Sequence, residues 1–310
     1  MAGTDQKTIA ITGATGFVGG RMLDLVVREG YVVRALTRRK QDDRPNVTWV
    51  RGALDDRASL ASLCGSADIV LHIAGVVNAP DRAGFEAGNV AGTLAVIEAA
   101  KQAGTKRFIH VSSLAATQPK LSIYGETKAT AEKLVATSGL DWTIIRPPAV
   151  YGPGDGEMLE LFKMARFGFV TLPPDADGRL SVIHVEDLCR ALLALLPEQE
   201  ELTAQTYEVD DGKTGGWTQA SFAKAIGWAI GKRITTIGLP NMLLRLGARA
   251  DRLIRRDKAK LTDDRVNYFC HDDWTVDPQK SLPKKLWFPQ IETREGLKNT
   301  AKWYRQNDWL

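Results

Sequence analysis

A tyrosine and a lysine four residues apart could together carry out a proton transfer. Tyr124 and Lys128 fall in a stretch with helical periodicity, so their side chains share one face of the predicted helix. A phenol with a pKa of about 10 exchanges protons poorly at neutral pH unless a nearby cation stabilises its anion. Lys128 supplies that cation. Ser113, at the end of the predicted strand 107–112, adds a hydroxyl that could hold a substrate oxygen.

A glycine-rich turn separates the first predicted strand from the first predicted helix, with the sequence TGATGFVG over residues 12–19. Gly13 permits a tight turn, Gly16 lets the backbone approach a pyrophosphate, and Gly19 allows the helix to pack closely on the strand. The free N–H groups and the dipole of the helix N-terminus then favour a phosphate. Because a strand precedes the turn and a helix follows it, the pattern predicts a dinucleotide site.

The end of the second predicted strand distinguishes between the two nicotinamide dinucleotides. An NAD site usually places Asp or Glu there for the ribose 2′-hydroxyl, whereas Arg accommodates the 2′-phosphate of NADP. This chain has Arg38, Arg39 and Lys40 in a row and no acid before Asp42. The three cations favour NADP(H) as the cofactor. The alternative interpretation is a solvent-exposed basic turn.

The helices and strands that must position these residues alternate along the chain, as the spacing of the hydrophobic residues changes between that of a strand and that of a helix. The predicted strands cover residues 7–12, 31–36, 47–51, 69–73, 107–112 and 142–146, and the predicted helices cover 19–29, 59–63, 89–102 and 125–138. Such alternation, with nearly continuous apolar strands, is typical of a parallel sheet covered on both faces. We therefore expect an α/β fold with a Rossmann-type doubly wound sheet.

The regular alternation of predicted strands and helices ends after Arg146, where a stretch rich in Pro and Gly leaves the predicted sheet. We expect a dinucleotide-binding domain over 1–150 and a smaller, mixed C-terminal substrate lobe over 151–310. A short strand near 181–184 followed by a helix also allows the chain to return to the sheet near 181–196.

Composition narrows the class of protein further. The 310 residues are 44% hydrophobic and 25% charged, which is typical of globular domains, and the net charge of +4 is too small to indicate nucleic-acid binding. The three cysteines lie far apart without CxxC spacing, and none of the four histidines has metal-ligand spacing. We expect no metal site and no disulfide framework. With no apolar run of about 18 residues and no secretory signal, we expect a cytoplasmic protein.

Further motifs accompany the glycine turn in a fixed order: HIAG (72–75), NVAGT (89–93), HVSS (110–113), YGETK (124–128) and RPPAVYGPGD (146–155). Over about residues 7–190 they resemble the extended or atypical short-chain dehydrogenase/reductases, also called the NAD-dependent epimerase/dehydratase family. The resemblance implies a catalytic triad of Ser113, Tyr124 and Lys128, with Asn89 as a supporting polar residue. Ser112 is the competing serine.

The same resemblance implies where a dinucleotide lies. Around the cofactor it places Gly13, Thr15, Gly16, Phe17, Val18 and Arg38, and near the nicotinamide it places Ala74 and Pro147. Tyr124 and Lys128 are also expected to contact the cofactor, and Lys128 could hold the nicotinamide ribose. Sugar-nucleotide members of the family typically have Asn before the V-Y-G-P segment, where this chain has Pro148 and Ala149. The departure favours the ketone-reducing branches and the NADPH-binding accessory subunit of respiratory complex I.

Two later segments bear on the substrate and on partners. The apolar, aromatic stretch 157–170 could line a site for a hydrophobic substrate, or it could simply be core. The stretch 241–260 carries seven cations and two acids. On a helical wheel its apolar face holds Leu243, Leu246, Gly247, Ala250, Leu253 and Ile254, and its opposite face holds Arg245, Arg249, Arg252 and Arg256. A basic amphipathic helix over 241–256 predicts peripheral contact with an anionic membrane surface; the alternative is a helix whose apolar face packs on the lobe.

These observations together predict an NADP(H)-dependent oxidoreductase that reduces a ketone, or oxidises the matching secondary alcohol, of a hydrophobic, lipid-like small molecule. A 3-oxo-ceramide-type or steroid-like ketone is the expected substrate class. Tyr124 would donate the proton, Ser113 would orient the oxygen, and Lys128 would tune Tyr124. Two alternatives remain: a sugar-nucleotide epimerase or dehydratase with retained NAD, and a non-catalytic NADPH-binding subunit.

Overall fold

The computed structural model describes residues 6–174, 177–255 and 262–310. Within these ranges the chain divides into two compact units. The first contains the chain up to Pro119 together with Ile123–Arg146 and Cys189–Tyr207, and the second contains Lys120–Ser122, Pro147–Leu188 and the chain from Glu208 onward. The two units are described separately below.

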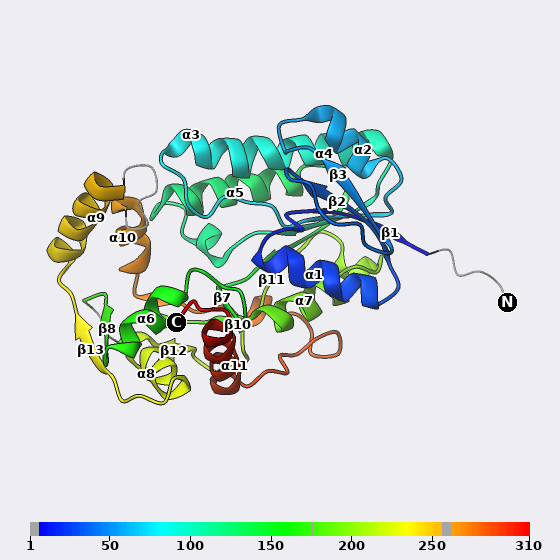
Figure 1. Cartoon of the computed structure of the whole chain (residues 1–310). Helices are drawn as coiled ribbons and strands as arrows, with labels where there is room; N and C mark the ends of the chain where they lie inside the picture. The colour runs from blue at the N-terminus through cyan, green and yellow to red at the C-terminus, as the bar shows by residue number, and fades with distance from the viewer. Residues whose placement is uncertain (1–5, 175–176, 256–261) are drawn as a thin grey trace. The chain divides into compact units, whose positions relative to one another are not determined.

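The first unit is built on a seven-stranded sheet with the order β11-β6-β5-β4-β1-β2-β3 (Figure 1). The bounds are β1 (Thr8–Thr12), β2 (Val32–Thr37), β3 (Val47–Arg51), β4 (Ile69–His72), β5 (Arg107–Val111), β6 (Asp141–Arg146) and β11 (Gln205–Glu208). The pairs from β3 to β6 are all parallel. The strand order reverses between β1 and β4, and open sheets of this kind bind ligands at that reversal. The predicted Rossmann-type α/β fold is confirmed.

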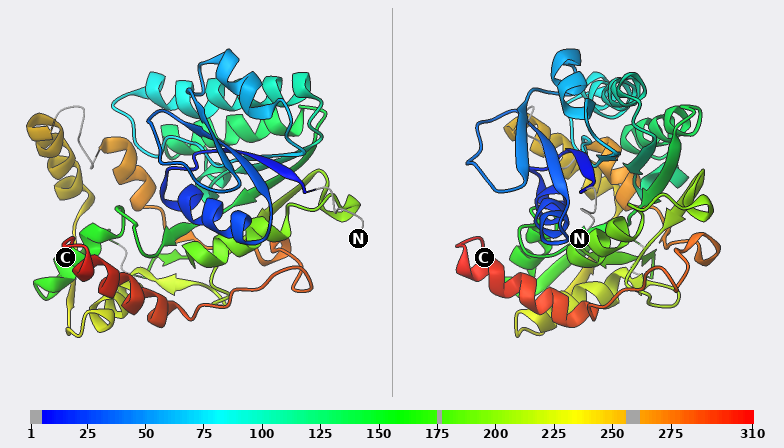
Figure 2. Two further views of the ribbon diagram at one scale, coloured as in Figure 1. Left: turned by 45° about the vertical axis from the view of Figure 1, so that its right-hand side comes forward. Right: turned by 90° about the vertical axis from the view of Figure 1, so that its right-hand side faces the viewer.

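Helices cover both faces of this sheet (Figures 1 and 2). The bounds are α1 (Phe17–Arg28), α2 (Arg57–Cys64), α3 (Arg82–Phe85), α4 (Gly92–Ala103) and α5 (Ile123–Ala136). On the face that α2, α4 and α5 cover, Leu60, Val96 and Phe108 are fully buried in one hydrophobic cluster. Burying each such side chain stabilises the fold by about 1.5–3 kcal/mol, so this packing holds the strand ends in place.

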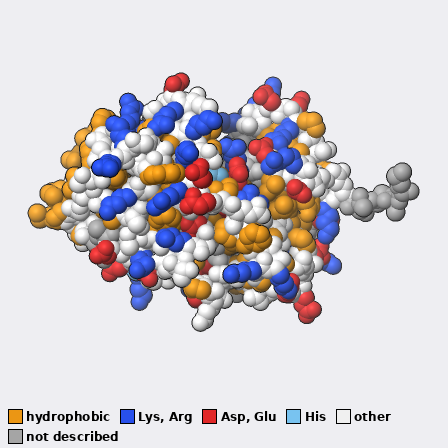
Figure 3. Space-filling view, turned by 90° about the horizontal axis from the view of Figure 1, so that it is seen from below, with side chains coloured by type: hydrophobic (Ala, Val, Ile, Leu, Met, Phe, Trp, Pro, Cys, Tyr) orange, Lys and Arg blue, Asp and Glu red, His pale blue; other side chains and the backbone are white. Residues whose placement is uncertain are grey.

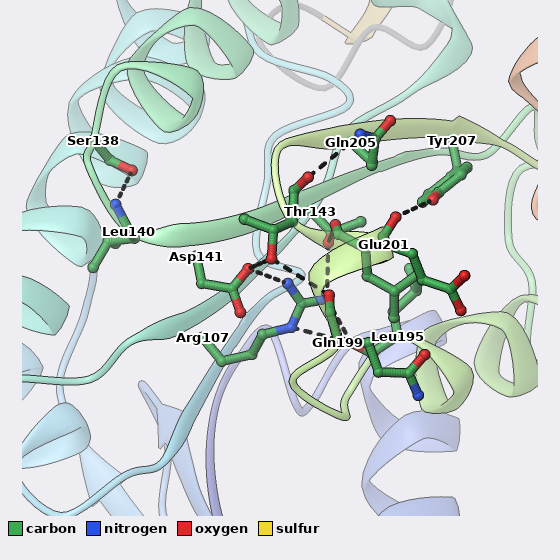
Figure 4. Close-up of polar contacts among 12 residues, drawn as sticks. Arg107, Ser138, Leu140, Asp141, Thr143, Leu195, Gln199, Glu201, Gln205 and Tyr207 are labelled. Atoms are coloured by element: carbon green, nitrogen blue, oxygen red, sulfur yellow. Dashed lines mark hydrogen bonds and ion pairs between the residues drawn. The ribbon is translucent and has the colours of Figure 1, made fainter.

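The segment Cys189–Tyr207 joins the first unit through a buried arginine (Figure 4). Arg107 is fully buried on β5, and its guanidinium donates to Asp141 Oδ1 at 2.9 Å, Thr143 Oγ1 at 2.8 Å and the Leu195 carbonyl at 2.7 Å. Thr203 Oγ1 donates to the same Asp141 oxygen at 2.7 Å. The returning segment therefore supplies partners that a buried cation requires.

The second unit combines small sheets with helices. Its strands are β7 (Ala149–Tyr151), β8 (Phe169–Leu172), β9 (Arg179–Leu180), β10 (Val182–His184), β12 (Trp217–Thr218), β13 (Thr235–Gly238) and β14 (Asp273–Trp274). Its helices include α6 (Leu159–Arg166), α8 (Gln219–Ala229), α9 (Asn241–Arg255), α10 (Asp263–Phe269) and α11 (Thr293–Gln306). Phe162 of α6 and Tyr304 of α11 are fully buried against each other, with ring centroids 5.2 Å apart. Most apolar residues of 157–170 thus lie in or against the core of this unit. This agrees with the interpretation of the stretch as core and not with a wall of a substrate site.

Candidate active site

The glycine turn lies between β1 and α1 and has no room for side chains at two positions. Gly13 has a φ of +77°, and a Cβ atom there would lie 2.8 Å from the Ala74 nitrogen. A Cβ atom on Gly19 would lie 2.0 Å from the Gly13 carbonyl oxygen. Only glycine fits either position, because contacts of this length do not occur between real atoms. Ala74, which the family resemblance implies to lie near the nicotinamide, thus lies directly against the turn.

The N-terminus of α1 is open to a phosphate. Gly16 is its capping residue, and no side chain caps the first turn. Thr15 and Gly16 are exposed, whereas Phe17 and Val18 in the first turn are half-buried. The first N–H groups of a helix have no partner within the helix and carry its positive dipole end. This turn and helix therefore fit the pyrophosphate of a dinucleotide.

The basic residues that the sequence assigned to the cofactor follow β2, the neighbour of β1. Thr37 is the last residue of β2, and its hydroxyl donates to the Arg39 carbonyl at 2.8 Å and accepts from the Arg39 N–H at 3.2 Å. These two bonds hold the turn, and Arg38 and Arg39 are both exposed after it. Because β1 and β2 are parallel, Arg38 leaves the sheet at the same edge as the glycine turn.

The three residues of the predicted triad come from β5 and α5. Lys128 is 4% exposed, and its ammonium donates to the Val111 carbonyl at the end of β5 at 2.8 Å. Ser113 follows two residues later, is 8% exposed, and accepts the Ala115 N–H at its hydroxyl at 3.2 Å. Tyr124 lies in the first turn of α5, one turn before Lys128, and is half-buried. The end of β5 and the start of α5 thus bring the three side chains to one edge of the sheet.

The ammonium group of Lys128 lies in an environment that disfavours its charge. Burial lowers the pKa of Lys128 to about 8, and the attraction of Glu132 offsets part of this effect. Glu132 is itself paired with Arg146, with 2.6 Å between Arg146 Nη2 and Glu132 Oε2. A lysine near its pKa at neutral pH is suited to adjust the protonation of a neighbouring phenol.

Asn89 is held in place by an unusual turn of helix. It lies in η1 (Glu86–Ala91), a π-helical turn between α3 and α4, and such turns often occur at functional sites. Its amide oxygen accepts the Val76 N–H at 2.7 Å, and its amide nitrogen donates to the Val76 carbonyl at 3.0 Å and to Thr127 Oγ1 at 3.1 Å. A Cβ atom on Gly75 would lie 3.3 Å from Asn89 Oδ1 and 3.7 Å from Lys128 Nζ. Asn89, Gly75 and Lys128 therefore converge.

A buried chain of hydrogen bonds behind this site was not anticipated from the sequence. Thr93 Oγ1 donates to the Asn89 carbonyl at 2.7 Å, so the same oxygen must accept from His72 Nε2 at 3.0 Å. His72 Nδ1 then accepts from Thr12 Oγ1 at 2.7 Å, and that oxygen accepts the Ala74 N–H at 3.2 Å. The chain runs from the glycine turn to Asn89 across β1, β4 and α4. The one signal for it in the sequence is the spacing of four residues between Asn89 and Thr93, which places them one helical turn apart.

Two histidines in this region are neutral. Burial, together with the charge of Lys128, lowers the pKa of His72 to about 3 and that of His110 well below its ordinary value. Their rings stack with centroids 5.3 Å apart. Neither nitrogen of His110, nor the hydroxyl of Ser112 beside the triad serine, has a hydrogen-bond partner among the described residues.

Pro147 belongs to the second unit, where it begins the stretch Pro147–Leu188. All the other predicted site residues lie in the first unit. Within the described ranges, no group of three or more His, Cys, Asp or Glu side chains is arranged to hold a metal ion.

Comparison with known proteins places this arrangement in a family. The model of the NAD dependent epimerase/dehydratase family matches residues 9–209. The chain belongs to that family. It is therefore an enzyme of the oxidoreductase type. The glycine turn between β1 and α1 is the part of the fold that fits a nicotinamide dinucleotide.

Two relatives and one solved structure are informative. A ceramide reductase of Caulobacter vibrioides is 32% identical over all of this chain and 98% of its own length. A 4-hydroxy-2-methyl-3-oxo-4-farnesyl-3,4-dihydroquinoline-1-oxide ketoreductase of Stigmatella aurantiaca is 28% identical over 65% of this chain and 67% of its own. The structure of MoeE5 in complex with UDP-glucuronic acid and NAD has a TM-score of 0.75 and 22% identity, covering 97% of this chain and 99% of that one. At this identity it bears on the fold alone.

Proposed function

We propose that this enzyme uses NADPH to reduce the ketone of a hydrophobic, lipid-like molecule, such as a 3-oxo-ceramide-type lipid, to the secondary alcohol. The observation that carries the proposal is the likeness to a ceramide reductase, which extends over the whole chain at 32% identity. The likeness to a ketoreductase of a farnesylated quinoline oxide supports the same reaction class and an apolar substrate.

Each residue of the site has a role in this reaction. When bound, the nicotinamide supplies a hydride to the carbonyl carbon. Ser113 holds the carbonyl oxygen at the end of β5, and Tyr124 gives that oxygen its proton. The ammonium of Lys128 is hydrogen-bonded to the Val111 carbonyl, and its charge stabilises the phenolate that forms when Tyr124 gives up its proton. Asn89, bound to both polar groups of Val76, keeps the adjacent Gly75 turn in place.

The preference for NADPH rests on Arg38 and Arg39. Both are exposed immediately after β2, where the 2′-position of the adenosine ribose lies in dinucleotide-binding sheets. A guanidinium that pairs with a phosphate makes charge-assisted hydrogen bonds, which a hydroxyl in the same place cannot match.

A second candidate function is the conversion of a sugar nucleotide with a retained NAD. It is favoured by the fold, which the chain shares with MoeE5 in complex with UDP-glucuronic acid and NAD. The sequence Pro148-Ala149, where sugar-nucleotide members typically have Asn, argues against it.

A direct assay distinguishes the two functions. Purified protein is supplied with NADPH and with a 3-oxo-ceramide, a steroid ketone or UDP-glucose, and the loss of NADPH absorbance and the products are followed. We expect NADPH oxidation with the 3-oxo lipid and none with UDP-glucose. Turnover of the UDP-sugar without added cofactor, by protein that is purified with bound NAD, would establish the second function instead.

A further inference from the structure

Helix α9 presents its apolar side to solvent. Five of the fourteen large hydrophobic side chains that are exposed in the described part of the chain lie on this one helix. They are Met242 at 70%, Leu243 at 48%, Leu246 at 50%, Leu253 at 81% and Ile254 at 81% exposed. Figure 3 shows the hydrophobic side chains gathered at the left edge of the molecule, over α9. An amphipathic helix of a globular protein normally turns such a stripe toward the core.

The opposite side of α9 is the one that packs. Ala248 is 2% exposed, and Leu244 and Asp251 are half-buried one turn to either side of it. Helix α10 contacts α9 (Figure 1). Arg245 Nη2 donates to Asn267 Oδ1 on α10 at 2.8 Å. The alternative that the sequence left open, an apolar face packed on the lobe, is therefore wrong for the described residues of this helix.

Positive charge borders the apolar stripe. Arg245 and Arg249 are exposed one turn apart. Arg256, the fourth cation of the predicted face, lies outside the described residues. A stripe of leucines beside a row of arginines matches the boundary between the acyl chains and the anionic headgroups of a bilayer. No helix in the described part of the chain is long and apolar enough to cross a membrane, so such a contact would lie in the interface.

We propose that α9 docks the protein on the surface of an anionic lipid bilayer, with Leu246, Leu253 and Ile254 in the acyl boundary and Arg245 and Arg249 at the headgroups. The exposure of the whole apolar side and the charge complementarity with anionic lipid carry this proposal. It does not depend on the proposed reaction, because no residue of the triad takes part.

The test is co-sedimentation of the full-length protein with vesicles. One set contains phosphatidylglycerol and phosphatidylcholine, and the other contains phosphatidylcholine alone. We expect binding to the anionic vesicles at low salt, and weaker binding as salt is added, because counterions screen the arginines within about 10 Å at 0.1 M. Each unit of charge at an anionic surface contributes about fivefold to partitioning, so Arg249→Glu, which changes the charge by two units, should weaken binding roughly 25-fold.

Matched variants separate docking from general effects of charge. Leu253→Glu places a carboxylate in the stripe and should lower partitioning at least tenfold, whereas Phe288→Glu, at a position that is 58% exposed outside α9, should leave it unchanged. Arg57→Glu, where the side chain is 89% exposed on α2, is the control for Arg249→Glu. Thermal melting should be the same for all four variants, since each changes an exposed side chain.

Three results would overturn the proposal: no sedimentation with anionic vesicles, equal sedimentation of Leu253→Glu and Phe288→Glu, or equal binding to both vesicle types at all salt concentrations. Light scattering adds a fourth. A dimer in solution that Leu253→Glu converts to a monomer, without vesicle binding by either form, would show that a second copy of this chain covers the stripe. Reductase activity on a water-soluble ketone is measured in parallel, so that failure of the docking and failure of the reaction are told apart.

Discussion

Lys128 carries its charge in a place from which solvent is excluded, and the triad depends on how that charge is held. Its ammonium has the Val111 carbonyl as a partner at 2.8 Å, and burial brings its pKa to about 8. The group can therefore respond to the state of Tyr124, one helical turn away, more readily than an exposed lysine could. The roles of single residues follow from this placement, and two of them can be tested by substitution.

Removing only the hydroxyl of Tyr124 tests the proton transfer. Tyr124→Phe should lower the turnover number roughly 10²–10⁴-fold, because general acid catalysis is commonly worth that much. The ring still packs near Phe85, whose centroid lies 6.4 Å away, so folding and cofactor affinity should be preserved. Steady-state kinetics and fluorescence titration with NADPH measure the two quantities. Turnover close to that of the wild type would remove Tyr124 from the mechanism.

Removing the guanidinium of Arg38 tests the cofactor preference. Arg38→Ala should weaken NADPH binding about tenfold or more and leave NADH binding unchanged, since a charge-assisted hydrogen bond contributes roughly 1.5–3 kcal/mol. Arg57→Ala, at another exposed position, on α2, serves as the control. An equal loss for both cofactors would assign Arg38 to a part of the site other than the 2′-phosphate.

At the scale of elements, the neighbouring strands β4 and β5 each bury a histidine beneath the site. His72 has a hydroxyl partner at each nitrogen and ties β1 to α4, whereas His110 has no hydrogen-bond partner among the described residues. Both have pKa values below those of the unfolded chain. Below pH of about 6.5 these two histidines bind protons in the unfolded state and not in the native state, so their contribution to the free energy of unfolding falls as the pH falls.

His110→Phe should reduce this acid sensitivity. The loss of stability amounts to about 1.4 kcal/mol per pH unit for each histidine that titrates only in the unfolded state. With one such group removed, the variant should match the wild type near pH 8 and exceed it near pH 5, because no hydrogen bond is lost. Thermal unfolding at the two pH values measures the difference. A parallel decline of the two proteins with pH would show that His110 is not neutral in the fold.

At the scale of the whole molecule, the chain enters the first unit again after leaving it. Cys189–Tyr207 belongs to that unit, and the buried Arg107 binds it through the Leu195 carbonyl, while Asp141 links it through Thr203. Breaking a buried ion pair by removing one partner costs about 3–5 kcal/mol. The sheet and the returning segment should therefore lose stability together.

Arg107→Leu tests this link. We expect a clear drop in the melting temperature and faster proteolytic cleavage within 189–207, because the Leu195 carbonyl loses its guanidinium donor and the carboxylate of Asp141 keeps only Thr203 as a donor. Lys106→Leu, at the exposed neighbouring position, is the control. Cleavage of both variants at the same rate would mean that the segment is held by other contacts.

The features predicted from the sequence were those that local pattern determines. The glycine turn, the strands and the pair Tyr124–Lys128 depend on spacings of a few residues, and strand bounds such as Val47–Arg51 agree with the prediction. The chain from Thr12 through His72 to Thr93 and the network of Arg107 were not anticipated, because their partners lie far apart in sequence. The side of α9 that packs was left open, since amphipathicity does not say which face meets the protein.

The network of Arg107 also bears on how the protein is made. Chains emerge from the ribosome N-terminus first. When residues up to Arg146 have been synthesised, β6 still lacks its neighbour β11, and Arg107 lacks the Leu195 carbonyl. Such an intermediate has an open sheet edge and an incompletely paired buried cation, which are features that promote aggregation. A gene fragment that ends near residue 150 should therefore yield insoluble protein, whereas one extended past Tyr207 supplies the missing strand.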